Sequence, residues 1–437
     1  MKNRICLKDL SSEVGKEVKM AGWVDVRRDH GKLVFIDLRD VTGKVQMVIL
    51  PTVEAYLVAQ EVRPEWVVEV DGVVQKRPEK LINKDEKNGE IEVQVSQMRV
   101  LSEAETSPIP IIQTNYDDEA EAPLRFDYRW LDLRQPKKAE IFEVWTEMER
   151  GFRDFWLENN FRQIYTPSLM NTPSESGAEV FEINYFDRKA YLAQSPQFYK
   201  QMAMAAGLER VFMVGPVFRA EPSFTTRHLT EFTGWDFEMS YIDSHHDVMD
   251  LEEGLIISGF KAVAQKFPEL DLTIPARPFP RITMVEAKEI LTKAGVFGGE
   301  EHDLSPEEER ALSEYVKRKM NHEFVFVTDY HESKSAFYHM RHEDDNTRSK
   351  RADLLFRGIE VTTLAQREHR LAILEKQAVA KGMKLEPLND YLNFFRYGCP
   401  PHGGAGIGPG RLIMKLLDLP NVREATYLPR DVKRLNP

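Results

Sequence analysis

Apolar and polar residues alternate along much of the first hundred positions, and this pattern predicts β-strands with one buried and one exposed face. The alternation is clearest from Val18 to Val26. The predicted elements are strands over 18–26, 33–38, 45–49, 66–74 and 91–95, with a helix over 53–62. Three strands, a helix and two further strands is the order of elements in a five-stranded OB-fold barrel.

A barrel of this kind commonly binds single-stranded nucleic acid, although a purely structural barrel would show the same pattern. Residues 1–100 hold 17 lysines and arginines and 17 aspartates and glutamates, so their formal charges balance. The formal charge of −12 therefore arises beyond residue 100. The first domain is thus the part of the chain that best tolerates phosphate groups.

The pattern changes after the barrel. Residues 102–123 contain three prolines and an acidic cluster, which is typical of a linker or hinge. A helix follows, because apolar residues recur at spacings of three and four from Ile141 to Phe155. Farther along, strand-like runs mix with helices without regular alternation, which favours an α+β domain on an antiparallel sheet. Residues 299–321 are highly charged and predict a solvated helix within an insertion.

The composition indicates a folded chain. Of the 437 residues 42% are hydrophobic, which excludes a wholly disordered protein, and the net charge excludes a globally basic nucleic-acid coat. No apolar run is as long as a membrane span, and the N-terminus lacks a signal core. With Cys6 and Cys399 alone, we expect neither a disulfide framework nor a cysteine zinc site, and we predict a cytoplasmic location.

The most informative chemistry lies in residues 218–232. A strand ends at Arg219, a loop of Pro, Ser, Phe and Thr follows, and Arg227 stands on the returning side. Two arginines at the ends of a mobile loop suit a polyphosphate, because arginine is always charged and makes bidentate contacts. Phe232 could stack on a purine. A surface hairpin with ordinary charge pairs is the alternative.

Three further segments are candidates for ligand contacts. Residues 403–411 are rich in glycine, which lets the backbone approach a ligand, but they match neither a Walker loop nor a dinucleotide fingerprint. Polar residues interrupt an apolar run at 194–201, which indicates a small polar ligand, a helix cap at Ser195, or both. Glu360, on a predicted strand, is a natural Mg²⁺ ligand or half of a cross-strand ion pair.

Together these segments resemble the class II aminoacyl-tRNA synthetases, and within them the compact, archaeal type of aspartyl-tRNA synthetase. The resemblance covers essentially the whole chain. It implies an OB-fold anticodon-binding domain over 1–101, a linker over 102–123, and a class II catalytic domain over 124–437 with an antiparallel sheet and helices. The three family motifs match about 140–167, 217–239 and 403–415, and a small insertion spans about 270–325.

The resemblance implies an ATP site. Arg219 would hold the α-phosphate, Arg411 the γ-phosphate, and Phe232 would stack on adenine. The other residues of this site would be Glu221, Arg227, His228, Leu229, Glu360 and Gly408. Glu360 and Thr363 would ligate Mg²⁺. The family usually has Ser where Thr363 stands, and Gly-Gly where this chain has Leu364-Ala365.

The resemblance also implies an L-aspartate site. Lys200 and Arg367 would clamp the side-chain carboxylate, because two cations favour an ionised group over a neutral amide. The asparaginyl relatives lack this lysine, so Lys200 favours aspartate. The remaining aspartate-binding residues would be Glu175, Ser195, Gln197, Asp236 and Thr363.

In the barrel, the resemblance places Phe35 against an anticodon base, with Arg28 and Gln46 beside it. Phe35 as an ordinary core residue is the alternative. Strict and relaxed members of the family tend to differ near Asp25, which favours acceptance of tRNA-Asn as well as tRNA-Asp. Pro167, after the motif 1 helix, would lie at the interface of a homodimer.

The implied reaction has two steps. The aspartate α-carboxylate attacks the α-phosphate of ATP and displaces pyrophosphate, and the terminal 3′-hydroxyl of tRNA then attacks the aspartyl-adenylate. The alternatives are an enzyme that charges both tRNA-Asp and tRNA-Asn, an asparaginyl-tRNA synthetase, a paralogue that makes asparagine, and a non-catalytic nucleic-acid-binding module. The barrel argues against the asparagine-making paralogue, and Arg219, Glu360 and Arg411 argue against the binding module.

Overall fold

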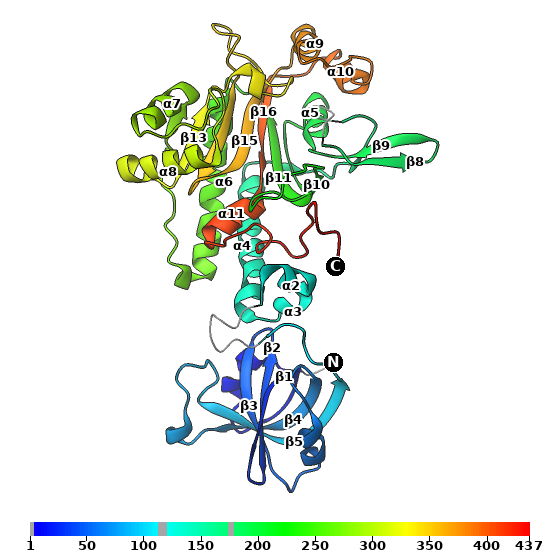
Figure 1. The fold of residues 1–437 in the computed structure, drawn as a ribbon, viewed down its shortest axis with the longest axis vertical. Coiled ribbons are helices and arrows are strands. Elements are labelled where there is room, and N and C mark those ends of the chain that lie inside the picture. Colours follow the sequence, from blue (N-terminus) through cyan, green and yellow to red (C-terminus); the bar gives the residue numbers. More distant parts are fainter. Residues whose placement is uncertain (1–3, 112–119, 174–178) are drawn as a thin grey trace. The chain divides into compact units, whose positions relative to one another are not determined.

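The computed structural model describes residues 4–111, 120–173 and 179–437, and the chain forms two compact units, 1–140 and 141–436. The first unit holds a closed barrel with the strand order β1-β2-β3-β5-β4. Its elements are β1 (Glu17–His30), β2 (Leu33–Asp40), β3 (Gly43–Ile49), α1 (Ala55–Glu61), β4 (Val67–Lys76) and β5 (Ile91–Ser102) (Figure 1). The predicted OB-fold is confirmed, and most strands are longer than their apolar pattern indicated.

Alternate residues of the strands fill the barrel interior. Val34, Ile36 and Leu38 of β2 are buried there, so the residues between them face outward. Phe35 is one of the outward residues, and it pairs with Arg28 of β1 in the antiparallel register. The alternative in which Phe35 is an ordinary core residue is therefore wrong. The same unit also contains the short helices α2 (Ala122–Asp127) and α3 (Arg129–Asp132).

The second unit is built on an eight-stranded sheet, ordered β12-β13-β14-β15-β16-β11-β10-β6. Its strands are β6 (Arg162–Gln163), β10 (Arg210–Phe218), β11 (Glu231–Ser240), β12 (Arg281–Thr283), β13 (Phe324–Thr328), β14 (Arg351–Phe356), β15 (Ile359–Arg367) and β16 (His402–Ile407). Neighbouring strands are antiparallel except at the two ends, where β12–β13 and β10–β6 are parallel. This sheet confirms the predicted α+β class.

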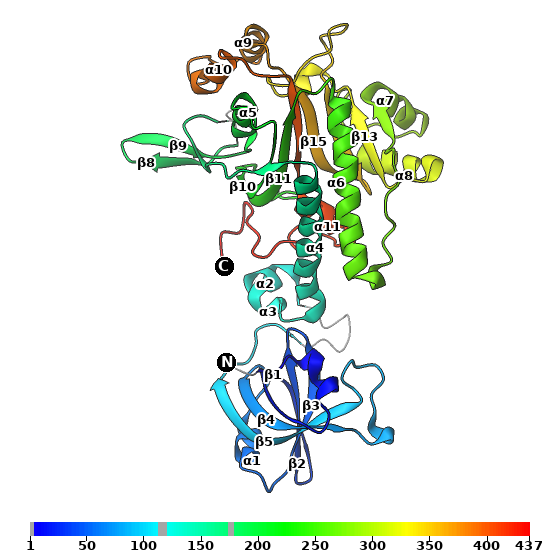
Figure 2. The same cartoon turned by 180° about the vertical axis from the view of Figure 1, so that it is seen from behind.

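Two long helices, α4 (Pro136–Glu158) and α6 (His245–Lys266), lie side by side against one face of this sheet (Figure 2). The apolar face that predicted α4 is buried, and its Trp156 stacks on Phe212 of β10 with ring centroids 4.5 Å apart. The helices meet at Gly151, where a Cβ atom would lie 2.7 Å from the carbonyl oxygen of Ser258. Glycine thus permits the close packing of α4 on α6.

The remaining elements surround the sheet. They are β7 (Leu169–Met170), β8 (Glu182–Tyr185), β9 (Arg188–Leu192), α5 (Gln197–Ala205), α7 (Met284–Lys293), α8 (Pro306–Met320), α9 (Leu371–Ala380), α10 (Asn389–Phe395) and α11 (Pro409–Leu416). The helix expected over 299–321 begins only after its N-cap Ser305. It is not wholly solvated, because Leu312 and Val316 pack in a core cluster with Val325. Among the described residues, we find no helix both long and apolar enough to cross a membrane.

Candidate active site

A pocket of about 1000 Å³ lies in the second unit, lined by residues of the central strands and of the first turns of α5 and α11. It brings together the residues that the sequence suggested for ATP and for aspartate. These are Ser195, Gln197, Lys200, Arg219, Glu221, Arg227, His228, Leu229, Phe232, Asp236, Glu360, Thr363, Arg367, Gly408 and Arg411. Glu175 lies outside the described residues.

A β-bulge in β15 places Glu360 in this pocket. Asp353 of β14 pairs with Thr363, and Leu355 pairs with Glu360, so Val361 is an extra residue between the two pairs. Without the bulge, residues 360 and 363 would point to opposite faces of the sheet, because the strand period is two. With it, the hydroxyl of Thr363 donates a hydrogen bond of 3.2 Å to Glu360 Oε1.

The glycine-rich segment forms β16 and leads into α11. A Cβ atom at Gly406 would lie 3.1 Å from Asp236 Oδ2, so the missing side chain leaves room for the carboxylates on the neighbouring strand β11. Helix α11 begins at Pro409, one residue after Gly408. This start places Arg411 in the first turn, where its guanidinium reaches the pocket.

One end of the pocket is rich in arginine. The Arg411 guanidinium donates to the carbonyl oxygen of Glu360 at 3.1 Å and to that of Arg227 at 3.3 Å. The Arg219 guanidinium lies 5.4 Å from the centroid of the Phe232 ring, within the range of a cation–π contact. Three guanidiniums around an open space form a site suited to a polyphosphate.

The electrostatics of this end are set by burial and by the arginines. Burial alone would raise the pKa of Glu360, but the positive charges of Arg411 and Arg351 outweigh burial, so the pKa is lowered and the carboxylate is ionised. Burial and then the charge of Arg411 lower the pKa of His228 to about 4. His228 is therefore neutral at pH 7 and adds hydrogen-bonding capacity without a further positive charge.

Sequence reasoning missed Glu309, a residue of α8. Its Oε2 lies 2.5 Å from Nη1 of Arg227, and the carboxyl group is buried. Burial raises the pKa of Glu309 to about 7, although the charge of Arg227 acts against this rise. Nothing in the residue pattern of the charged helix singled out Glu309, because its partner is 82 positions away in the chain.

The other end of the pocket holds two buried cations. Lys200 is 1% exposed, and its Nζ lies 2.8 Å from Asp236 Oδ2 and 3.5 Å from Glu238 Oε2. Arg367 donates from Nε to Glu238 Oε1 at 3.0 Å and from Nη2 to the Gly404 carbonyl oxygen at 2.9 Å. Two internal carboxylates thus balance the two cations, and this end can bind one charged or polar group of a small ligand.

Sequence reasoning also missed Glu238, although a signal was present. Asp236 and Glu238 are two positions apart in β11, so they face the same side of the sheet, whereas Trp235 and Phe237 face the core. Asp236 was already predicted to bind the ligand. A second carboxylate two positions later, in an otherwise apolar part of the strand, therefore indicates that Glu238 also faces the pocket.

The residues present fit a hard cation in one place. No group of three or more His, Cys, Asp or Glu side chains is arranged to hold a metal ion among residues 4–111, 120–173 and 179–437. Glu360 and Thr363 nevertheless supply an ionised carboxylate and a hydroxyl beside the arginine-rich end. Mg²⁺ commonly binds through one or two carboxylates together with substrate phosphates, and this donor set suits that mode.

The barrel of the first unit carries its own polar face around Phe35. Arg28 makes two contacts of 2.8 and 2.9 Å with Asp37, and its Nη2 lies 3.4 Å from Gln46 Oε1. Gln46 in turn donates to Glu92 at 3.0 Å. The three residues predicted for nucleic-acid contacts therefore share one outward face. Asp25, in contrast, is buried and lies 3.2 Å from Arg39.

Comparison with known proteins finds two matching family models. Residues 121–432 match the tRNA synthetases of class II (D, K and N), and residues 18–101 match the OB-fold nucleic acid binding domain. The chain is 40% identical to the aspartate–tRNA(Asp/Asn) ligase of Aeropyrum pernix, over 98% of this chain and 97% of that protein. It is also 40% identical to the aspartate–tRNA(Asp) ligase of Pyrococcus abyssi, over 97% of each.

Solved structures give a similar result. The asparaginyl-tRNA synthetase from Pyrococcus horikoshii complexed with asparaginyl-adenylate superimposes with a TM-score of 0.91 at 32% identity, covering 100% of both chains. An aspartyl-tRNA synthetase from Entamoeba histolytica superimposes with a TM-score of 0.87 at 31% identity, covering 99% of this chain and 93% of that one.

Proposed function

Because this chain belongs to the class II tRNA synthetases of the D, K and N group, and is therefore a ligase, we propose that it attaches L-aspartate to tRNA at the expense of ATP. The observation that carries the choice of amino acid is the buried pair of Lys200 and Arg367 at the end of the pocket remote from the arginine-rich end. A ligand that reaches both ends would present a carboxylate to this pair and a polyphosphate to the arginines.

In the first step, the α-carboxylate of aspartate attacks the α-phosphorus of ATP, and pyrophosphate leaves. The nucleophile is already ionised, so no general base is needed. Arg219 neutralises charge at the α-phosphate, and Arg411 binds the distal phosphates. Hydrogen bonds to the carbonyl oxygens of Glu360 and Arg227 hold Arg411 at the pocket before the substrates bind. Glu360 and Thr363 would hold Mg²⁺, which supplies further neutralisation of the phosphates when bound.

In the second step, the 3′-hydroxyl of the terminal adenosine of tRNA attacks the activated carbonyl carbon, and AMP leaves. His228 and Arg227, on the loop between β10 and β11, are the residues proposed to contact the acceptor end. Phe35, Arg28 and Gln46 are proposed to contact the anticodon. We further propose a cytoplasmic homodimer with Pro167 at its interface, and acceptance of both tRNA-Asp and tRNA-Asn.

Two measurements test this function. ATP–pyrophosphate exchange should depend on aspartate, and exchange that depends on asparagine alone would replace the aspartyl assignment with an asparaginyl one. Charging of purified tRNA-Asp and tRNA-Asn transcripts, side by side, should then yield aspartylated products from both. A tRNA-Asn transcript that stays uncharged while tRNA-Asp is fully aspartylated would restrict the enzyme to tRNA-Asp.

A further inference from the structure

Glu309 of α8 holds an arginine of the pocket without lining the pocket itself. Arg227 is a lining residue, and its Nη1 lies 2.5 Å from Oε2 of Glu309, which is 5% exposed. The Nε and Nη2 groups of Arg227 donate to no residue that the structure describes. One edge of the guanidinium is thus bound by Glu309, and the other N–H groups are left for a ligand.

The backbone around Arg227 is fixed independently of Glu309. The carbonyl oxygen of Thr226 accepts a hydrogen bond of 2.9 Å from the N–H of Val422. The carbonyl oxygen of Arg227 accepts one of 3.3 Å from Nε of Arg411. These contacts leave open only the direction of the long Arg227 side chain, which has many rotamers. The contact with Glu309 selects one direction.

The start of α8 gives Glu309 a defined position. The hydroxyl of Ser305 accepts from the N–H of Glu308 at 3.3 Å, and the Glu308 carboxylate accepts from the N–H of Ser305 at 2.9 Å. The same carboxylate lies 2.7 Å from Nζ of Lys288 in α7. This part of the helix is therefore held by contacts in which Glu309 takes no part, so its carboxylate is preorganised.

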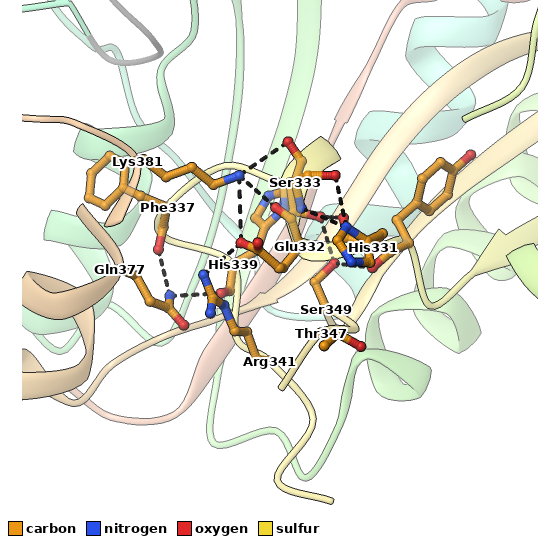
Figure 3. Close-up of polar contacts among 12 residues, drawn as sticks. His331, Glu332, Ser333, Phe337, His339, Arg341, Thr347, Ser349, Gln377 and Lys381 are labelled. Atoms are coloured by element: carbon orange, nitrogen blue, oxygen red, sulfur yellow. Dashed lines mark hydrogen bonds and ion pairs between the residues drawn. The ribbon is translucent and has the colours of Figure 1, made fainter. Parts of the chain in front are cut away.

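A turn over residues 331–335 adds to this bracing. Lys334 of the turn lines the pocket, and its Nζ lies 2.9 Å from Glu300, in the loop before α8. Figure 3 shows how the turn itself is held, with Lys381 donating to the carbonyl oxygens of Glu332 and Ser333 at 2.6 and 3.1 Å. The loop that leads into α8 is thus connected to the wall of the pocket.

The stability of the fold gives little reason for a buried carboxylate at this place. Burial raises the pKa of Glu309 to about 7, against the charge of Arg227. Replacing a buried ion pair with apolar residues of similar volume is often neutral or stabilising. A role in orienting a ligand-binding side chain accounts for the pair better, because such side chains need a second layer of contacts to hold them.

We propose that Glu309 is a positioning residue, which holds the Arg227 guanidinium toward the distal phosphates of bound ATP, beside Arg411. The proposal rests on the ATP-dependent ligase function proposed above. It gives the insertion that contains α7 and α8 a part in the first step of the reaction. Glu309 acts through Arg227 and does not itself touch the substrate.

The test uses variants of the full-length chain in pyrophosphate exchange, which gives the KM for ATP and the KM for the amino acid. Glu309→Leu fills the buried space but removes the acceptor, whereas Glu309→Gln keeps an acceptor oxygen for Nη1. Arg227→Ala and the double variant with Glu309→Leu complete a double-mutant cycle. Glu307→Leu, on the exposed side of the same turn, is the matched control. Thermal unfolding shows whether each variant is folded.

We expect Glu309→Leu to raise the KM for ATP about 10-fold, the low end of the range for removing a group that orients a ligand-binding side chain. The KM for the amino acid should stay nearly unchanged, and Glu309→Gln should recover most of the loss. In the Arg227→Ala background, Glu309→Leu should add little, because the two residues act as one unit.

Three results would overturn the proposal. They are an unchanged or lowered KM for ATP in folded Glu309→Leu, an equal rise in both KM values, and an undiminished effect of Glu309→Leu in the Arg227→Ala background. If Glu309→Leu does not fold, Glu309→Asp takes its place, because it keeps the carboxylate but shortens its reach. The same rise in the KM for ATP is then expected, and the same results count against it.

The wild-type protein separates failure of this role from failure of the proposed function. Wild-type exchange with aspartate, together with an insensitive Glu309→Leu variant, would refute the role alone. Wild-type exchange with asparagine alone would overturn the aspartyl function, and the KM for ATP in that exchange would still test Glu309. Absence of exchange with either amino acid would overturn both.

Discussion

At the scale of single residues, the arginines at one end of the pocket should control the rate of the ATP-dependent step. Arg219→Ala and Arg411→Ala should each lower aspartate-dependent pyrophosphate exchange at least ~10²-fold, because each removes a positive charge that would stabilise the reacting phosphates. Arg150→Ala is the matched control, since Arg150 lies on the exposed side of α4 and pairs there with Glu147 and Asp154 of the same helix. Near-normal exchange in either pocket variant would remove that arginine from its proposed role.

The two buried cations should act on the amino acid rather than on ATP. Lys200→Ala should raise the aspartate KM by an amount equivalent to roughly 2–5 kcal/mol, since it removes one partner of a buried charge pair. The ATP KM should stay nearly unchanged. Lys189, an exposed lysine paired with Glu182, provides the control Lys189→Ala. An equal rise in the KM for aspartate and the KM for ATP would indicate a general loss of structure. Thermal unfolding of the variant would reveal such a loss.

Phe35 should matter for tRNA and not for aspartate activation. Phe35→Ala should weaken tRNA binding by roughly 1–3 kcal/mol, the range for loss of one stacked base. Pyrophosphate exchange, which needs no tRNA, should be unaffected. The neighbouring Ile36 is 0% exposed, so Ile36→Ala should instead destabilise the barrel by roughly 2–5 kcal/mol. Loss of stability in Phe35→Ala of the same size would contradict its position on the outer face.

At the scale of elements, helix α6 carries a titratable group inside the core. Burial raises the pKa of Glu252 to about 8, with a further contribution from the neighbouring charge of Glu253. An unfolded glutamate has a pKa of about 4.3, so the folded state binds the proton more tightly. Stability is therefore fully present below the unfolded pKa and is lost as pH rises toward 8.

Glu252→Gln should remove this dependence. Wild type and variant should unfold at similar temperatures near pH 4.5, and the variant should be more stable at pH 8, by on the order of 1–5 kcal/mol. Thermal unfolding at a series of pH values measures the difference. A difference in stability that stays constant over this range would show that the pKa of Glu252 is the same in the folded and unfolded states. Glu289→Gln, on the exposed face of α7, is a suitable control.

The elements and their contacts also show which features of the protein could be predicted from the sequence. The strands of the barrel could be predicted from a period of two, because one face of each strand is buried and the other is not. The pocket residues on the motif segments were predicted because these segments together resemble the three motifs of the class II synthetases. Glu309 could not be predicted, because its role depends on a contact between α8 and Arg227, which lies in a distant loop.

At the scale of the whole molecule, we expect two copies of the chain to associate. Pro167 is exposed between β6 and β7, after the long apolar helix α4. Light scattering at micromolar concentration should give twice the chain mass of 50.6 kDa. A structure of the dimer should show an interface above ~1,000 Å². A fully active species of 50.6 kDa would contradict the dimer. Arg162 and Gln163 in the adjacent β6 supply neighbouring positions at which charge substitutions can probe the interface.

The bulge in β15 has a consequence for how this strand can vary among relatives. Val361 is the one residue that brings Glu360 into phase with Thr363. Deleting any single residue between Glu360 and Thr363 would point the side chain of Glu360 into the hydrophobic layer on the opposite face of the sheet. The side chain of Arg367 would keep its present direction. A change of length by one is therefore more damaging here than most changes of side chain. We expect aligned relatives that keep the activity to show neither gap nor insertion between positions 360 and 363, even where individual residues differ.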